Sequence, residues 1–410
     1  MTRRKAARII PIRPLETSPA APAGTLEFRV PLPLSLYVHV PWCVQKCPYC
    51  DFNSHQLRDG LPEAEYVAAL IADLESALPL VWGRRIVSIF FGGGTPSLLS
   101  AAALDTLLTA IRTRLPLVHD AEITLEANPG TVEADKFAAF REAGVNRLSL
   151  GIQSFDPAHL KALGRIHDAD QARHAAALAV RHFDNFNLDL MYGLPGQTVA
   201  QALADVEQAL AFAPTHLSCY QLTIEPNTAF AVSPPALPDS DRCADMQDAI
   251  EARLGEAGFV HYETSAFARP GRQCRHNLNY WTFGDYLGIG AGAHGKLTLH
   301  DGKVWEVRRQ MRWKQPKQYL SGVAAGRPLQ DEFSVGAGDL PFEFMMNALR
   351  LNEGFDAALF EARTAQPLTV VETILRRAEK DGLLVRDAGR IAPTRHGRRF
   401  LNRLLEMFLA

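Results

Sequence analysis

The chain has 410 residues, of which 47% are hydrophobic and 21% charged, and its formal net charge at pH 7 is −2. This is the composition of an ordinary soluble protein, long enough to bury the cores of two domains. The near balance of charge argues against a nucleic-acid-binding or anionic-membrane function for the whole chain. No run of about 18 apolar residues occurs, so we expect no membrane-spanning helix.

The first 33 residues are basic and rich in proline and alanine. Basic side chains precede any acidic one at Arg3, Arg4, Lys5, Arg8 and Arg13. Organelle transit peptides share this charge pattern, but they are amphipathic and rich in serine, which this segment is not. We therefore expect 1–33 to be a disordered tail and, for a bacterial chain, a cytoplasmic protein.

A loop with three cysteines follows the first apolar run. Leu34–Val40 predicts a buried strand that ends at Pro41, and the next residues carry Cys43, Cys47 and Cys50 in the spacing CxxxCxxC. Three thiolates are one fewer than the four that saturate a cubane iron–sulfur cluster, so a cluster here would keep one iron open for chemistry.

Two other roles for these thiols are weaker. A disulfide framework does not suit a chain with 6 cysteines in 410 residues and an odd number in the group. A structural zinc site normally has a second CxxC pair, which this chain lacks.

Short apolar runs alternate with helical patterns from Leu34 to Leu222. The expected strands are Leu34–Val40, Ile86–Phe91, Glu122–Ala127, Arg147–Leu150, Phe186–Met191 and Leu217–Leu222. Strands that alternate with helices pair in parallel through right-handed crossovers. The predicted fold class is therefore α/β, with a partial (β/α)6 barrel over 34–235. The motifs follow the carboxyl ends of these strands, where barrel chemistry takes place.

A glycine run follows the second of these strands. Gly92–Pro96 has the sequence GGGTP, and its glycines let the backbone approach a ligand closely enough to bind a carboxylate or an amine. Glycine-rich turns are common, so this run becomes informative only together with the three-cysteine loop.

Further motifs follow in chain order. They are Glu122–Gly130 (EITLEANPG), Asn146–Phe155 (NRLSLGIQSF), Leu163–Arg165 (LGR) and Leu188–Gln197 (LDLMYGLPGQ). With the cysteine loop and the glycine run, they resemble the radical S-adenosylmethionine (SAM) family over most of the chain, and within it the oxygen-independent coproporphyrinogen III oxidases. The resemblance implies a [4Fe–4S] cluster on Cys43, Cys47 and Cys50, with the methionyl part of SAM on the fourth iron.

The resemblance also implies which residues surround SAM. Positions around the cluster-bound SAM are matched by Tyr37, Tyr49, Gly93 and Glu126. Positions that bind a second SAM in the oxidase are matched by Gly94, Thr95, Gln153, Arg165 and Asp189. Thr223 and His294 stand at two further contact positions with different residue types. SAM needs hydrogen-bond partners for its hydroxyls, amine and carboxylate and an apolar slot for adenine, and these residue types suit that need.

One position departs from the oxidase pattern. The oxidases have a fourth cysteine, in CxxxCxxCxC, where this chain has Phe52. Its loss resembles the HemW subgroup, whose members are described as haem chaperones.

A second motif also resembles that subgroup. His276–Trp281 reads HNLNYW and is followed by the glycine-rich Gly284–Gly295; in HemW-like proteins the pattern HNxxYW is associated with haem binding. Imidazole is a common axial haem ligand, and aromatic faces can flank a porphyrin, so His276, Tyr280 and Trp281 are the haem candidates. The alternative is that His276 and Trp281 pack the barrel edge. Cys274 is a nearby thiol for haem or, in the simpler account, a buried cysteine.

The last third of the chain changes pattern. We expect 236–330 to complete the barrel and supply loops on the haem or substrate side, and 331–410 to form a HemN-like, mainly helical and winged-helix-like domain. The expected elements are helices at Asp241–Ala257, Phe342–Leu351, Val370–Asp381 and Gly397–Phe408 and a hairpin at Leu384–Ala392. Arg395, Arg398, Arg399 and Arg403 are more typical of a solvated helix face than of DNA recognition, so no nucleic-acid partner is expected.

Two classes of function remain open. The first is a carrier that binds a [4Fe–4S] cluster, SAM and haem and hands haem to acceptor haemoproteins such as respiratory enzymes. The second is an enzyme that cleaves SAM reductively and uses the resulting radical to decarboxylate a porphyrinogen, with the chemistry supplied by the cofactor. Phe52 and the HNLNYW segment favour the carrier.

Overall fold

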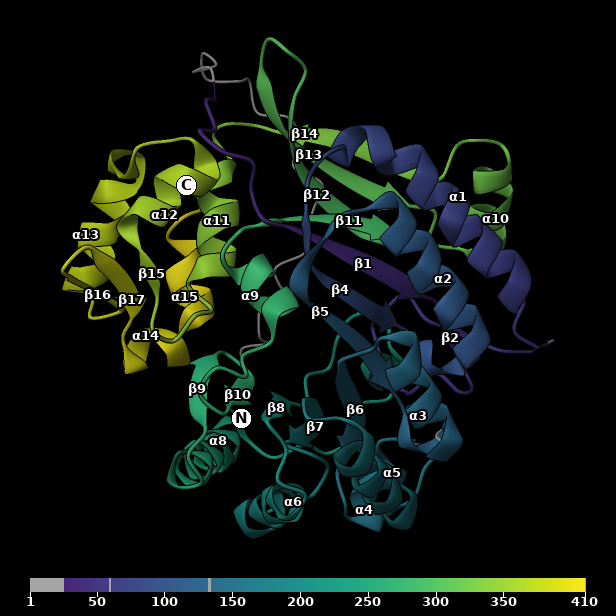
Figure 1. The fold of residues 1–410 in the computed structure, drawn as a ribbon. Helices are drawn as coiled ribbons and strands as arrows, with labels where there is room; N and C mark the ends of the chain where they lie inside the picture. The colour runs from purple at the N-terminus through teal and green to yellow at the C-terminus, as the bar shows by residue number, and fades with distance from the viewer. Residues whose placement is uncertain (1–25, 59, 132–133, 410) are drawn as a thin grey trace.

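The computed structural model describes residues 26–58, 60–131 and 134–409. Within them, one twelve-stranded sheet organises most of the chain, in the order β14-β13-β12-β11-β1-β4-β5-β6-β7-β8-β10-β9. The carboxy-terminal elements gather on one side of this sheet, around a small sheet of their own (Figure 1).

The middle of the large sheet is parallel and follows chain order. It consists of β1 (Leu34–Val40), β4 (Ile86–Gly93), β5 (Leu117–Ala127), β6 (Arg147–Gln153), β7 (Phe186–Tyr192) and β8 (His216–Gln221). Each strand pairs in parallel with the next along the chain. The predicted α/β class and partial (β/α)6 barrel are therefore confirmed.

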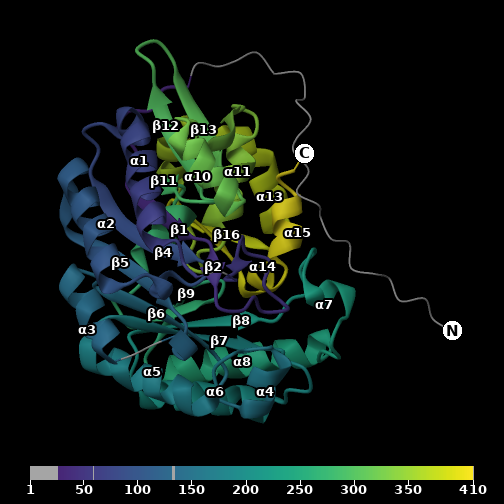
Figure 2. The ribbon, with the colours of Figure 1, turned by 90° about the vertical axis from the view of Figure 1, so that its right-hand side faces the viewer.

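Helices connect these strands along their outer face. They are α1 (Glu63–Val81), α2 (Ala101–Arg114), α3 (Ala134–Ala143), α4 (Pro157–Ala162), α5 (Ala169–His182) and α6 (Val199–Ala211). Figure 2 shows α1, α2 and α3 side by side. Asp168 with Gln171 and Thr198 with Gln201 form capping boxes that begin α5 and α6, and these satisfy backbone N–H groups that the helix leaves free.

Further strands extend the sheet at both ends. Beside β1 lies β11 (Asp285–Ile289), also parallel, and then the antiparallel strands β12 (His294–His300), β13 (Trp305–Arg312) and β14 (Leu329–Val335). Beyond β8 lie β10 (Ala266–Ala268) and β9 (Val260–Glu263). The helix expected at Asp241–Ala257 is α8 (Ser240–Glu256). The short helix α9 (Arg275–Trp281) contacts β4, β1 and β11 and lies between the sheet and the carboxy-terminal elements (Figure 1).

The carboxy-terminal elements surround a second hydrophobic core. They are α11 (Leu340–Ala348), β15 (Phe355–Asp356), α12 (Ala357–Thr364), α13 (Glu372–Lys380), β16 (Leu384–Asp387), β17 (Arg390–Pro393), α14 (Arg395–Arg399) and α15 (Leu401–Glu406). The single helix expected at Gly397–Phe408 is instead divided at Phe400, which has φ −116° and ψ 39°. This bend lets Gly397 lie against the Leu383 backbone while Leu404 is buried in the second core.

The segment before β1 packs against this second core. Of the stretch 1–33, only 26–33 lies within the described residues. Phe28 and Leu32 are buried there, and the Phe28 ring lies 5.5 Å from the ring of Trp305 between centroids. Among the helices of the described residues, none combines the length and apolar character needed to cross a membrane.

A buried ion cluster joins β11 to its neighbours. Asp285 is fully buried and accepts hydrogen bonds from Lys296 Nζ at 3.0 Å, Arg84 Nη2 at 2.8 Å and the Thr298 backbone at 2.8 Å. Burial alone would raise the pKa of Asp285, but Lys296 and Arg84 outweigh it and hold that pKa below its usual value. The carboxylate therefore stabilises the fold in its ionised form.

We expect Asp285→Ala to destabilise the protein by about 3–5 kcal/mol, because it leaves the buried Lys296 ammonium without its partner. Asp331→Ala, at an exposed position of β14, should change the free energy of unfolding by less than about 0.5 kcal/mol. Urea unfolding measures both. Because the folded pKa of Asp285 is depressed, its contribution is present above the unfolded value of about 3.9 and is lost as the pH falls. Equal stability of the two variants would contradict the prediction.

Candidate iron–sulfur and ligand site

The cysteine loop and the glycine run are held together by their backbones. The Gly94 N–H donates to the Val40 carbonyl and the Thr95 N–H to the Trp42 carbonyl, both at 2.7 Å. A Cβ at Gly94 would lie 2.5 Å from the Trp42 oxygen, so only glycine fits there. The ends of β1 and β4 thus form one rigid edge, and the cysteines follow directly from it.

Cys43, Cys47 and Cys50 are free thiols, each half-buried. Burial raises the pKa of Cys43 and of Cys50, and the Ser54 hydroxyl opposes this at both. Thiolates are the form that binds iron, and a bound metal deprotonates its thiols outright. Cys43 and Cys50 therefore favour the neutral thiol without metal, whereas an iron–sulfur cluster bound to the loop would hold its ligating thiols ionised.

Arg165 closes one side of the cysteine loop. Its Nη1 lies 3.5 Å from the Cys47 sulfur and 3.5 Å from the Tyr49 hydroxyl oxygen, while Nη2 donates to the Gly151 carbonyl at 2.8 Å. The motif that predicted this arginine, LGR, follows α4 and turns at Gly164, whose φ is +64°. The Arg165 guanidinium therefore bridges the cysteine loop and the end of β6.

A cavity of about 470 Å³ opens on the other side of the loop. The barrel strands contribute Tyr37, His39, Gly93 and Glu126, and α9 contributes Tyr280 and Trp281. The remaining lining residues are Phe52, Asn53, Phe90, Phe283, Gly284, Tyr286, Gly292, His294, Lys296, Arg309 and Asn347. This volume is within the range of small-molecule and cofactor sites, and the lining combines aromatic side chains with polar and charged ones.

Glu126 is the acidic group of the cavity wall. Burial and the nearby Asp189 raise the pKa of Glu126 to about 8, and a backbone hydrogen bond from Gly93 acts in the opposite direction. Burial also raises the pKa of Asp189, which accepts hydrogen bonds from Asn187 Nδ2 at 2.8 Å and Ser149 Oγ at 3.2 Å. A carboxyl group whose pKa is raised in this way favours a cationic partner, because a nearby positive charge stabilises its ionised form.

The structure separates the predicted SAM residues into groups. Tyr37, Gly93 and Glu126 line the cavity, whereas Tyr49 and Arg165 stand beside Cys47. Gly94 and Thr95 contribute their backbones to the edge described above, and Gln153 ends β6 with φ +68°. Thr223 is exposed and donates to Glu225 at 2.8 Å, but His294 lines the cavity.

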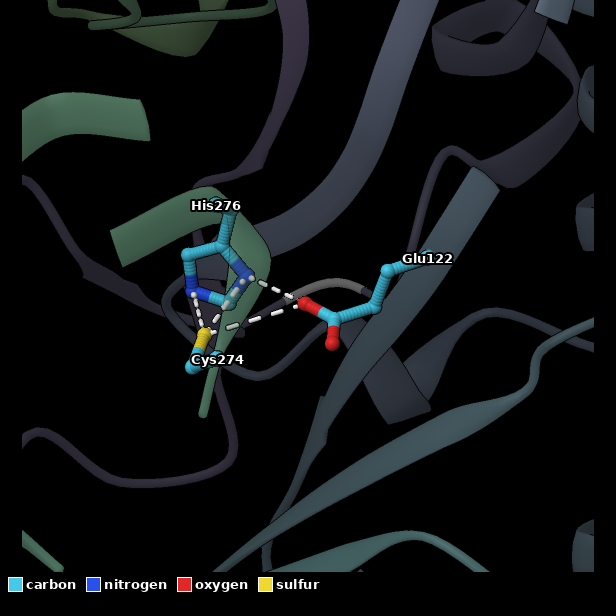
Figure 3. A group of neighbouring side chains, drawn as sticks. All are labelled: Glu122, Cys274 and His276. Carbon is cyan, nitrogen blue, oxygen red and sulfur yellow. Dashed lines mark hydrogen bonds and ion pairs between the residues drawn. The ribbon is translucent and has the colours of Figure 1, made fainter. Parts of the chain in front are cut away.

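His276 is placed differently from its two motif partners. Its side chain is buried (4% exposed) and stacks on Phe90 with centroids 4.0 Å apart and planes at 6°. Glu122 lies 3.6 Å from His276 Nδ1, and Cys274 Sγ is 3.2 and 3.3 Å from the two ring nitrogens (Figure 3). Tyr280 and Trp281 line the cavity and His276 does not.

Glu122, Cys274 and His276 each offer a ligand atom within 4.8 Å of the others. A sulfur at nearly equal distance from both ring nitrogens lies over the ring face, since an in-plane sulfur would collide with Cε1. Imidazole binds metals through the lone pair in its plane, so this arrangement does not form a metal site. Glu122 also accepts the Arg275 N–H at 2.9 Å. The three side chains therefore anchor the start of α9.

Several cavity residues were not predicted from the sequence. His39 lies on β1 and Asn53 in the DFNSH stretch after the cysteines, close to motifs that had been recognised. Arg309 on β13 and Asn347 on α11 come from segments with no motif, and only the fold brings them to the cavity.

Comparison with known protein families agrees with this architecture. The model of the radical SAM superfamily matches residues 37–209, and that of the HemN C-terminal domain matches residues 337–400. Among solved structures, the coproporphyrinogen III oxidase HemN from Escherichia coli, a radical SAM enzyme, is similar with a TM-score of 0.78 and 26% identity, over 92% of this chain and 90% of that one.

Curated relatives narrow the assignment. The heme chaperone HemW of Escherichia coli (strain K12) is 52% identical over 379 residues, which cover 92% of this chain and 98% of that protein. The heme chaperone HemW of Mycobacterium tuberculosis (strain ATCC 25618 / H37Rv) is 37% identical over 374 residues, 89% of this chain and 92% of that protein. With the radical SAM fold and nearly full-length identity of this kind, the chain belongs to the family of the heme chaperone HemW.

Proposed function

We propose that this protein is a haem chaperone that binds haem in the 470 Å³ cavity and hands it to acceptor haemoproteins such as respiratory enzymes. The observation that carries the proposal is the position of that cavity. Residues of β1 and β4, next to the cysteine loop, and Tyr280 and Trp281 of the HNLNYW helix α9 line this same cavity. The names of the relatives agree with this function.

In this proposal Cys43, Cys47 and Cys50 hold a [4Fe–4S] cluster. A bound cluster supplies an open iron that the amine and carboxylate of SAM can chelate. The Arg165 guanidinium lies 3.5 Å from the Cys47 sulfur, and the backbone hydrogen bonds of Gly94 and Thr95 hold the cysteine loop beside β4. The cysteine loop lies next to the cavity, since Phe52 and Asn53, which follow Cys50 closely in the chain, line the cavity.

SAM is assigned to the side of the same cavity that β1, β4 and β5 line, together with Tyr49 beside Cys47. Tyr37, Tyr49, Gly93 and Glu126 would surround the SAM on the cluster, with the Glu126 carboxylate accepting the cationic amine. A second SAM, if this chain binds one, would use Gly94, Thr95, Gln153, Arg165 and Asp189.

Haem is assigned to the α9 side of the cavity. Tyr280 and Trp281 offer aromatic surface to a porphyrin, and the Arg350 guanidinium covers the Trp281 ring from 4.3 Å. His276 contributes as a positioning residue, because its stacking on Phe90 and its contacts with Glu122 and Cys274 fix α9. Phe52 also supports a carrier over an oxidase: its side chain, 65% exposed, lines the cavity where the oxidases have a cysteine.

The proposed function is tested by anaerobic reconstitution with iron and sulfide, haem titration by absorption spectroscopy, and an assay with coproporphyrinogen III, SAM and a reductant on the same sample. We expect saturable, stoichiometric haem binding and no turnover, with a coproporphyrinogen III oxidase assayed in parallel as the positive control. Turnover with only weak haem binding would overturn the chaperone and favour the oxidase.

The Cys43→Ser, Cys47→Ser, Cys50→Ser triple variant should lose the iron–sulfur chromophore after reconstitution, because serine does not replace thiolate as a ligand of such clusters. Cys243→Ser is the matched control, since Cys243 is buried on α8, outside the cysteine loop, and it should keep the full absorbance. A chromophore that survives in the triple variant would place the cluster on other residues.

Trp281→Ala should weaken haem binding by about 2- to 10-fold, the equivalent of about 0.5–1.5 kcal/mol for one aromatic contact. Trp82→Ala is the control, because Trp82 is 80% exposed after α1 and does not line the cavity. Haem titration measures the haem affinity of both variants. If the two affinities are equal, haem binds elsewhere.

A further inference from the structure

We propose that His294 supplies the axial nitrogen ligand to the iron of haem bound in the cavity. This inference rests on the proposed function, and it assigns the ligand to the start of β12 rather than to the histidine of the HNLNYW motif. Among the side chains that line the cavity, His294 has ring nitrogens that are free to bind iron.

Two histidines line the cavity, His39 and His294, and the described lining includes neither cysteine nor methionine. Both ring nitrogens of His39 are already engaged, Nδ1 with the Tyr37 hydroxyl at 2.7 Å and Nε2 with the Asn53 carbonyl at 2.8 Å. Binding iron through His39 would break one of these hydrogen bonds in a buried place, and a buried polar group left without a partner is costly.

The other polar side chains of the lining are poorer ligands. Burial raises the pKa of Tyr37 and of Tyr280 well above the usual value, so both are neutral phenols. Tyr286 accepts a hydrogen bond from Arg309 at 2.8 Å, and Lys296 is paired with Asp285 at 3.0 Å. Haem iron is commonly held by imidazole, thiolate, thioether or phenolate, which leaves the His294 ring.

The His294 ring is free. Throughout the described part of the chain, the structure gives it no hydrogen bond and no ion pair, and its side chain is exposed toward the cavity. Burial of part of the ring, together with Lys314 and Arg309, lowers the pKa of His294. The ring therefore stays neutral at pH 7, which is the form that binds a metal.

The backbone that carries His294 is rigid. Gly290 and Gly292 have φ +102° and +84°, and a Cβ at Gly292 would lie 2.0 Å from Asn53 Nδ2. Asn53 in turn donates to the Ala291 and Lys314 carbonyls, both at 3.0 Å. The turn before His294 is thus tied directly to the end of the cysteine loop. A ligand on such a support needs little ordering when haem binds.

The test is haem titration of the full chain, read by absorption and by electron paramagnetic resonance of the ferric complex. In His294→Ala we expect the nitrogen-ligand signature to disappear and the affinity to fall at least about tenfold, since even outer-sphere partners of metal ligands contribute that much. His300→Ala is the matched control, because His300 is exposed at the other end of the same strand, β12. It should leave both readouts unchanged.

Two further variants separate the possible outcomes. His294→Met should fold and give a thioether-ligand spectrum in place of the nitrogen one, which a structural role would not produce. His276→Ala should weaken binding but retain nitrogen ligation. Two results would overturn the inference if the parent chain does bind haem. One is an unaltered spectrum and affinity in both His294 variants, and the other is loss of nitrogen ligation only in His276→Ala. A parent chain that binds no haem would instead refute the proposed function.

Discussion

The parallel pairing of β1 on both sides is the constraint on which the rest of the site depends. β1 pairs with β4 on one side and with β11 on the other, both in parallel. The carboxyl ends of parallel strands meet at one edge of a sheet. The cysteine loop, the glycine run and the glycine-rich turn before His294 therefore meet in space, although hundreds of residues of chain separate the first from the last. Hydrogen bonds from Gly94, Thr95 and Asn53 then join the three loops.

The sequence was sufficient to predict the barrel. The strand Leu34–Val40 has the predicted bounds, because an uninterrupted apolar run before a proline has few alternatives to a buried strand. Strands β12 to β14 were not predicted individually, since their segments contain no long apolar run and β14 is exposed along most of its length. His276 shows a second limit: its residue type suggests a ligand, but burial against Phe90 decides what the side chain can reach.

The cavity illustrates why a motif cannot define a site by itself. Its walls come from β1, β4, β5, α9, β11, β12, β13 and α11, which belong to both the barrel and the carboxy-terminal elements. Arg309 reaches it only because Glu343 on α11 and Tyr286 on β11 hold the guanidinium there. The positions of such residues are determined by packing between distant segments. Neither the periodicity nor the motif spacing of a sequence predicts that packing.

The burial of Phe28 and Leu32 has a consequence for how the chain folds. The second core contains residues from the segment before β1 and residues as late as Phe408. During synthesis the amino-terminal segment emerges first, yet its apolar partners are made last. Contacts of such high sequence separation form slowly, because the intervening chain must be ordered before they stabilise anything. The barrel can thus assemble on the ribosome, while the second core closes only after the whole chain has been released.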